Sequence, residues 1–169
     1  GRNDLTEEEY FQVIKYKTAI LFEAAARVAA IVAKAQIEKE EALANYAINI
    51  GTAFQIADDI LDYTGDSNTM GKNVGDDLLE GKVTLPLIYL LKNGSESEKK
   101  SIINAIDDPH NANVEFIINT IKNSNAISYC SSLAHDYVDK AICQLRIFDD
   151  SEYKSAMIEL AQTAINRIS

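Results

Sequence analysis

The chain has 169 residues, of which 47% are hydrophobic and 25% charged, and it contains only 7 glycines and 2 prolines. So few glycines and prolines argue against a turn-rich β-sandwich, a collagen-like chain or a disordered one. The net charge is −10 and no cluster of lysines and arginines occurs, so we expect no binding to nucleic acid. No apolar run approaches the ~18 residues of a membrane span. The composition predicts one mostly helical domain over residues 1–169.

A first long helix is predicted over residues 6–36. It opens on Thr6, a favourable N-cap residue, and three glutamates follow in the first turn. Residues 18–35 are apolar nearly all round, which is typical of a helix buried at the centre of a bundle.

A second helix is predicted over residues 38–63, ending before Gly65, which suits a C′ position. We place the break between the two helices near Ile37, because one uninterrupted helix would be unusually long for a globular domain. The two helices are therefore expected to form an antiparallel hairpin.

The polar stretch 65–75 contains three of the seven glycines and is interpreted as a functional loop or lid. A helix is then predicted to start at Asp76 and to continue through Pro86, which would kink it unless it lies in a first turn. Further helices are predicted near residues 95–106, 111–123, 126–147 and 151–168. No strand-like alternation persists, so the predicted fold class is all-α.

Three aspartates crowd the end of the second helix. Asp58 and Asp62 are one turn apart and Asp59 lies beside them, on a face shared with Thr52 and Gln55. Like charges at this spacing cost about 0.2–0.5 kcal/mol per pair. Anions in the last turns also oppose the helix dipole by ~0.3–1 kcal/mol. A well-patterned helix that breaks both rules is a candidate site. The opposite face, expected to be apolar, carries Tyr46, Ala47, Ile50, Phe54, Ala57 and Leu61.

Two interpretations of these aspartates are open. Packed carboxylates are hard oxygen ligands, and Mg²⁺ typically takes one or two of them together with waters and substrate phosphates. The alternative is a solvated acidic face, which a chain so rich in acidic residues could easily produce.

Lys17 favours a ligand site. Its helical neighbours three and four residues away are all apolar, and lysine is rarely buried there unless an anion pairs with it. Equal rise along the hairpin puts Lys17 level with Ala57, beside the aspartates. This placement fits a diphosphate held between Lys17 and a metal bound by Asp58 and Asp62. A direct salt bridge, or a lysine that reaches solvent, stays open. The apolar neighbours are Val13, Ile14, Ile20 and Leu21.

Two further lysines each follow a glycine, in the pairs Gly71-Lys72 and Gly81-Lys82. Glycine lets the backbone approach a ligand closely, and lysine supplies a point charge for phosphate oxygens. Each pair alone is weak evidence for phosphate binding.

The two cysteines, Cys130 and Cys143, lack the spacing of a metal site. We expect both to be free thiols in a reducing compartment, the cytoplasm. No signal peptide is recognisable, and because the sequence starts at Gly1 without a methionine, a preceding segment is expected.

Four segments occur in an order that resembles a known family. They are Tyr10-x6-Lys17-Thr18-Ala19-x-Leu21-Phe22, the run GTAFQIADDILD over 51–62, the run GKNVGDD over 71–77, and Gly81-Lys82-x-Thr84-x-Pro86. Together they resemble the C-terminal half of a trans-isoprenyl diphosphate synthase, most closely the bacterial long-chain (octaprenyl) type. The resemblance is strong over residues 5–92 and continues as compatible helical sequence over 93–169.

The resemblance implies a helical bundle of the isoprenoid synthase type, in which two aspartate-rich motifs face each other across the mouth of a cavity. Asp58, Asp59 and Asp62 would be the second motif. They would bind Mg²⁺ ions that bridge them to the diphosphate of an allylic substrate.

The same resemblance implies roles for five further residues and a reaction. Lys17, Lys72 and Lys82 would contact phosphate, and Thr18 and Gln55 would lie beside the developing allylic cation. The reaction would be the Mg²⁺-dependent condensation of isopentenyl diphosphate with an allylic diphosphate, catalysed by a transferase. Its long-chain polyprenyl product would supply an isoprenoid quinone side chain.

Half of the implied active site has no counterpart in this sequence. The family's first aspartate-rich motif, its arginine pair and the side chains that set product length lie upstream of the matched region, and family chains are nearly twice as long. The chain is therefore interpreted as a fragment that is inactive alone. Its expected partner is the N-terminal half of the same enzyme, which is expected to be a homodimer when complete.

Two other functions are weighed. A non-catalytic helical subunit would keep the fold while a partner supplies the chemistry, but Lys17, Lys72 and Gln55 argue against a degenerate module. A class I terpene cyclase shares metal-triggered ionisation without using isopentenyl diphosphate, and the Gly-Lys pairs argue for the synthase instead.

Overall fold

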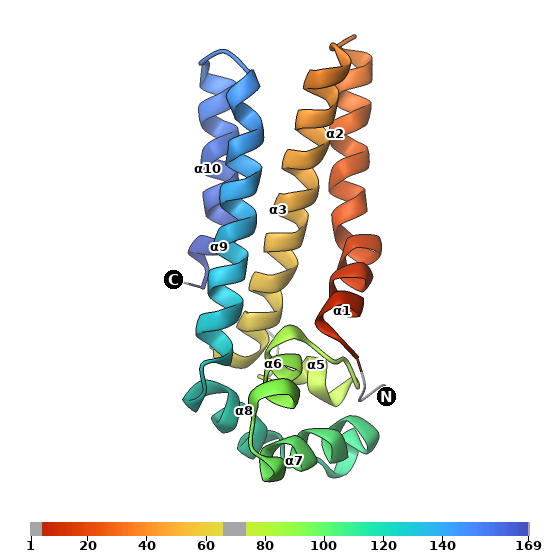
Figure 1. The fold of residues 1–169 in the computed structure, drawn as a ribbon, viewed down its shortest axis with the longest axis vertical. Coiled ribbons are helices and arrows are strands. Elements are labelled where there is room, and N and C mark those ends of the chain that lie inside the picture. Colours follow the sequence, from red (N-terminus) through yellow and green to blue (C-terminus); the bar gives the residue numbers. More distant parts are fainter. Residues whose placement is uncertain (1–4, 66–73, 169) are drawn as a thin grey trace. The chain divides into compact units, whose positions relative to one another are not determined.

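The computed structural model describes residues 5–65 and 74–168, and every regular element in these ranges is a helix (Figure 1). Among the residues described no strand occurs, which confirms the all-α class. No helix in this part of the chain has the length and apolar character needed to cross a membrane.

The chain divides into two compact units, each built from two stretches that are distant in sequence. The aspartate unit combines Gly1–Tyr10 with Asp58–Ser131, and the hairpin unit combines Phe11–Ala57 with Ser132–Ser169. The boundaries fall within the helices α1 (Glu7–Ile14), α3 (Ile37–Thr64) and α9 (Ala126–Gln144). Since neither unit is a continuous stretch of sequence, the single domain expected over 1–169 stays a prediction.

The hairpin unit contains the predicted antiparallel helix pair, formed by α2 (Ile20–Val32) and α3 (Figure 1). A short turn joins them, and Lys34 in this turn has a positive φ of 54°. The helix break predicted near Ile37 is confirmed, because α3 begins at that residue.

The continuous helix predicted over 6–36 is interrupted by one turn of π-helix, η1 (Lys15–Ala19). Here the amide of Ile20 bonds the carbonyl of Lys15, five residues back instead of four. Single π-turns inserted in α-helices are often found at functional sites. This one contains Lys17 and Thr18, two of the predicted site residues.

Arg27 ties α2 to α3 near the turn of the hairpin. Its guanidinium lies 2.9 Å from Glu23 on α2, and it reaches Glu40 at 3.3 Å and Glu41 at 2.8 Å on α3. The hydrogen bond to Glu41 and the other two carboxylates raise the pKa of Arg27 above its ordinary value.

Small residues allow a close approach between η1 and α3. Ala19 is fully buried, and a Cβ added at Gly51 would lie 2.8 Å from the Cα of Ala19 and 3.2 Å from the ring of Phe22. Next to this contact the hydroxyl of Thr18 donates to the side-chain oxygen of Gln55 at 3.0 Å. This pairing agrees with the predicted register, in which residues near 17 are level with residues near 57.

α2 is not the buried central helix that its composition predicts. Ala30 is its one buried residue, and large apolar side chains of α2 are up to 77% exposed. Together with two exposed side chains of α1 and η1, five of them make up what we call the apolar strip: Val13, Tyr16, Ile20, Leu21, Val28, Ile31 and Val32. The expectation failed because a helix that is apolar all round is buried only if other helices cover the sides that α3 leaves open.

The rest of the hairpin unit is the second part of α9, followed by η3 (Leu145–Ile147) and α10 (Glu152–Asn166). The hydroxyl of Tyr46 on α3 donates to the carbonyl of Met157 on α10 at 2.6 Å. The helices predicted near 126–147 and 151–168 are thus confirmed to within a few residues. Their buried positions are mostly small and include Ala134, Val138, Ala141, Ala161 and Ala164.

The aspartate unit is built from shorter helices around one apolar core. They are α5 (Asp76–Leu79), α6 (Leu85–Asn93), α7 (Glu96–Asp107), η2 (Pro109–Asn111) and α8 (Val114–Asn123). The buried core comprises Tyr63, Leu78, Leu87, Leu90, Ile102, Ala105, Ile106, Ile117, Ile121 and Ala126.

The single helix predicted from Asp76 through Pro86 is wrong. α5 ends at Leu79, and Gly81, with a φ of +73°, turns the chain before α6 begins. Pro86 lies in the first turn of α6. The amides of a first turn make no hydrogen bond within the helix, so proline, which lacks an N–H, is tolerated there.

Replacing Gly51 with alanine tests the close approach of η1 and α3. Alanine is the better helix former by about 1 kcal/mol, but its Cβ would press on the backbone of Ala19 at 2.8 Å, and overpacking costs about 1–3 kcal/mol. We expect Gly51→Ala to lower the midpoint of thermal unfolding, measured by circular dichroism. A rise in the midpoint would show that the contact is loose.

Candidate functional site

The aspartates at the end of α3 do not form a solvated acidic face. Only 4% of Asp59 and 6% of Asp62 is exposed, and Asp58 is half-buried. Phe54, which was expected on the buried apolar face, is instead 38% exposed. The helix therefore buries part of its polar face, and buried carboxylates need hydrogen-bond donors.

Asp59 accepts a hydrogen bond from a buried tyrosine on α1. The hydroxyl of Tyr10, which is 3% exposed, donates to Oδ2 of Asp59 at 2.7 Å. Sequence reasoning missed this partner, although Tyr10 opens the first of the four segments that carry the family resemblance.

Asp62 holds the chain where it returns to α3 after the glycine-rich stretch. Its backbone carbonyl accepts from the amide of Gly75 at 2.8 Å, and its carboxylate accepts a longer bond from the amide of Asp77 at 3.3 Å. Gly75 has a φ of +87°, a conformation that is strained for residues with a side chain. The glycine thus permits the turn that brings these amides to Asp62.

Lys82 binds acidic side chains of its own segment. Its ammonium lies 2.7 Å from Asp77 and 2.6 Å from Glu80. The hydrogen bond that Lys82 donates to Asp77, then the one that it donates to Glu80, raises the pKa of Lys82. Its phosphate contact stays a prediction. The sequence predicts only a helix start at Asp77; the signal for its pairing with Lys82 is an acid five residues before the lysine.

Asp58 differs from its two neighbours. Its carboxylate makes no hydrogen bond or ion pair within the described part of the chain. Asp59 and Asp62, in contrast, accept from Tyr10 and from the amide of Asp77. Of the three aspartates, Asp58 is therefore the one whose oxygens are not already engaged by described residues.

Lys17, Thr18 and Gln55 belong to the hairpin unit. Lys17 is exposed, while Thr18 is half-buried and bonded to Gln55. The apolar surroundings predicted for Lys17 are only partly buried: Ile14 is 4% exposed, but Leu21 is 68% exposed. The predicted approach of Lys17 to the aspartates stays a prediction, and Lys72 lies outside the described residues.

No group of three or more histidine, cysteine, aspartate or glutamate side chains in the described ranges is arranged to hold a metal ion. An all-protein cage around a metal is therefore not formed by these residues. A cation held by one or two carboxylates and completed by other ligands is not affected by this finding.

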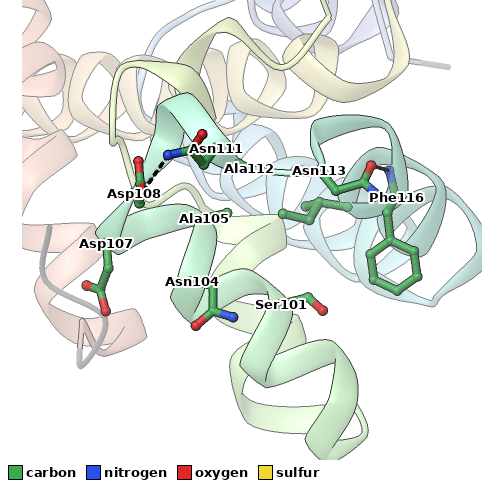
Figure 2. A pocket seen from close by; sticks show the side chains of 10 residues that line it. Ser101, Asn104, Ala105, Asp107, Asp108, Asn111, Ala112, Asn113 and Phe116 are labelled. Atoms are coloured by element: carbon green, nitrogen blue, oxygen red, sulfur yellow. Dashed lines mark hydrogen bonds between the residues drawn. The ribbon is translucent and has the colours of Figure 1, made fainter.

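A pocket of about 630 Å³ lies between α7, η2 and α8 in the aspartate unit (Figure 2). Polar groups line much of it: Asn111 donates to Asp108 at 2.8 Å, and Asn113 accepts from the amide of Phe116 at 3.1 Å. Among the residues predicted to bind metal or diphosphate, those that the structure describes do not line this pocket.

Comparison with known proteins supports the family resemblance. The chain matches the Polyprenyl synthetase family over residues 1–121. It belongs to this family. The matched region includes all the predicted site residues, from Lys17 to Lys82.

The relatives are prenyl diphosphate synthases. The all-trans-nonaprenyl-diphosphate synthase (geranyl-diphosphate specific) of Rhodobacter capsulatus is 42% identical over 165 residues, covering 98% of this chain and 50% of the relative. The octaprenyl diphosphate synthase of Escherichia coli (strain K12) is 40% identical over 165 residues, covering 97% and 51%. The chain thus spans about half the length of these relatives and corresponds to a C-terminal half.

The fold is likewise that of this family. The polyprenyl synthase of Caulobacter crescentus CB15, whose crystal structure contains calcium and isoprenyl diphosphate, matches with a TM-score of 0.93 at 38% identity. The match covers 99% of this chain and 52% of that one. The predicted all-α isoprenoid synthase fold is confirmed.

The two cysteines should differ in reactivity. Both are free, but Cys130 is buried and Cys143 is exposed. Burial, followed by the nearby charges of Asp59 and Glu7, raises the pKa of the Cys130 thiol, so the reactive thiolate is scarcer at any given pH. We expect iodoacetamide at neutral pH to label Cys143 in the folded protein and Cys130 only after denaturation, as measured by peptide mass spectrometry. Equal labelling rates would contradict the burial of Cys130.

Proposed function

We propose that this chain forms the C-terminal half of the active site of a polyprenyl diphosphate synthase. The complete enzyme would condense isopentenyl diphosphate with an allylic diphosphate, using Mg²⁺, to make a long-chain product for an isoprenoid quinone. Family membership and two relatives that are long-chain synthases support prenyl chain elongation as the reaction.

This proposal rests on one observation: the three aspartates differ in burial and in the hydrogen-bond donors that reach them. Asp59 and Asp62 are buried with hydrogen-bond donors, whereas Asp58 is half-buried at the same helix end without one among the described residues. Neutral donors lower the cost of burial, but they do not cancel the repulsion between acids one turn apart. A cation beside Asp58 and Asp62 would remove that repulsion.

The donor set fits Mg²⁺. Carboxylate oxygens are hard ligands, and Mg²⁺ is usually held by one or two of them, with waters and substrate phosphates completing its octahedral shell. We assign Asp58 and Asp62 as the carboxylates that would hold it. Ca²⁺, the ion in the Caulobacter crescentus structure, also prefers oxygen ligands.

The chain's own residues would assist the departure of the diphosphate. Bound Mg²⁺ would neutralise negative charge on the leaving group. Lys17, Lys72 and Lys82 would add positive charge at the phosphate oxygens, an effect that is strongest in a site closed to water. When the C–O bond to diphosphate ionises, an allylic cation forms. The alkene of isopentenyl diphosphate then attacks that cation, and loss of a proton completes a five-carbon extension.

Thr18 and Gln55 would lie beside this cation. The hydroxyl of Thr18 donates to the side-chain oxygen of Gln55 at 3.0 Å, which fixes the orientation of both groups. Oriented neutral dipoles can stabilise a developing positive charge without a solvent shell.

We further propose that the N-terminal half of the enzyme completes the site. The chain spans about half of its curated relatives. The apolar strip on α1, η1 and α2 leaves side chains such as Leu21 and Val32 exposed by 68% and 77%. Large exposed apolar side chains at helical spacing favour a contact with other protein. These features favour a half-site over a self-sufficient helical subunit.

Binding of a metal–diphosphate complex tests the half-site directly. We expect Mg²⁺ and inorganic pyrophosphate together, but neither alone, to raise the unfolding midpoint of this chain. At a ligand concentration 100 times Kd the gain is about 2.7 kcal/mol, which is several degrees for a protein of this size. Asp58→Ala should abolish the shift, whereas Asp139→Ala, which removes an exposed acid from α9, should retain it. Equal shifts in the wild-type chain and Asp58→Ala would contradict the assignment.

We expect catalysis to require the N-terminal half of the enzyme as well as this chain. We expect this chain alone to incorporate no isopentenyl diphosphate into farnesyl diphosphate, because the groups that would complete the metal site come from elsewhere. The measurement is incorporation of radiolabelled isopentenyl diphosphate into butanol-extractable product. Steady turnover by the isolated chain would refute the half-site proposal.

A further inference from the structure

Tyr10 and Asp59 form a buried pair in the aspartate unit. The two side chains are 3% and 4% exposed, and the tyrosine hydroxyl donates to Oδ2 of Asp59 at 2.7 Å. They lie 49 residues apart in the sequence, on α1 and α3. This bond therefore joins the start of the first helix to the aspartate-rich end of the third.

The bond is of the strong kind. A hydroxyl that donates to a carboxylate makes a charge-assisted hydrogen bond, which is typically short and about twice as strong as one between neutral groups. A buried carboxylate that loses such a donor bears much of its desolvation penalty. The position of Asp59 is thus tightly coupled to the presence of the Tyr10 hydroxyl.

Tyr10 is presented by an anchored turn of helix. At the start of α1 the carboxylate of Glu9 accepts from the amide of Thr6 at 2.9 Å, and the amide of Glu9 donates back to the hydroxyl of Thr6 at 3.2 Å. The hydroxyl of Tyr129 donates to Glu7 at 2.9 Å in a separate bond that is not part of this cap. The donor to Asp59 therefore comes from a helix start that Thr6 and Glu9 cap.

Negative charge is concentrated around this pair. Burial raises the pKa of Tyr63, and the carboxylates of Asp62, Asp59 and Asp77 raise it further. Lys82 pairs with Asp77, and the hydroxyl of Tyr10 donates to Asp59. A neutral donor orients a carboxylate without cancelling its charge.

We propose that Tyr10 is a positioning residue for the aspartate motif. By holding Asp59 in the core, Tyr10 fixes the rotation of the last turns of α3, and with it the directions of Asp58 and Asp62. Asp59 then positions the metal ligands rather than serving as a ligand itself. This inference rests on the proposed function, since it assumes that Asp58 and Asp62 bind a metal.

The experiment compares two tyrosines that each donate to a carboxylate in the same unit. Tyr10→Phe removes the donor to Asp59, and Tyr129→Phe, the matched control, removes the donor to Glu7. Mn²⁺ binding to the 169-residue chain is measured by electron paramagnetic resonance in the presence of inorganic pyrophosphate, below the unfolding midpoint of every variant. We expect Tyr10→Phe to weaken Mn²⁺ binding about 10-fold or more, the usual effect of losing a group that orients a metal ligand. Tyr129→Phe should bind as the wild-type chain does.

A double-mutant cycle with Asp59→Asn checks that Tyr10 acts through Asp59. If it does, the losses of Mn²⁺ affinity in Tyr10→Phe and Asp59→Asn are not additive. Additive losses, wild-type affinity in Tyr10→Phe, or equal losses in Tyr10→Phe and Tyr129→Phe would overturn the positioning role while leaving the proposed function intact. A wild-type chain that binds no Mn²⁺ with pyrophosphate would overturn both.

Discussion

Acidic side chains held inside a protein must each be supplied with a donor, and this requirement organises the aspartate unit. The end of α3 brings Asp59 and Asp62 almost fully out of solvent. Two kinds of donor bind them: a tyrosine hydroxyl from α1 donates to Asp59, and a backbone amide from the start of α5 donates to Asp62. Because these donors come from segments distant in sequence, the acids also hold the unit together.

The helices could be predicted because their signals are local. Thr6 with its glutamates marks a helix start, the break near Ile37 follows from a limit on helix length, and Pro86 is admissible only in a first turn. The all-α class and the antiparallel hairpin both followed from such rules. The aspartates could also be singled out, since like charges one turn apart conflict with the rest of a well-patterned helix.

The donors could not be predicted, because they depend on contacts that no local rule contains. Tyr10 and Asp59 meet only when α1 and α3 have packed, and Asp77 reaches Asp62 only because Gly75 adopts a positive φ of +87°. The π-turn at Lys15–Ala19 could not be predicted from the sequence either, since nothing in KYKTA forbids an ordinary α-turn. The crowding of the aspartates was therefore evident in the sequence, but the donors that lower the cost of burying Asp59 and Asp62 were not.

The apolar strip consists of side chains whose apolar character is not explained by contacts within the described part of the chain. Residues 18–35 are apolar on nearly every side, yet α3 packs on one side of this stretch, where Ala19 at the end of η1 lies close to Gly51. Helix positions that face water are usually polar, whereas a helix that is apolar on every side is usually buried on every side. Val28, Ile31 and Val32 are exposed by 60% or more. The proposed half-site would account for their apolar character, because the other half of the enzyme would pack on them; the chain spans about half the length of its relatives.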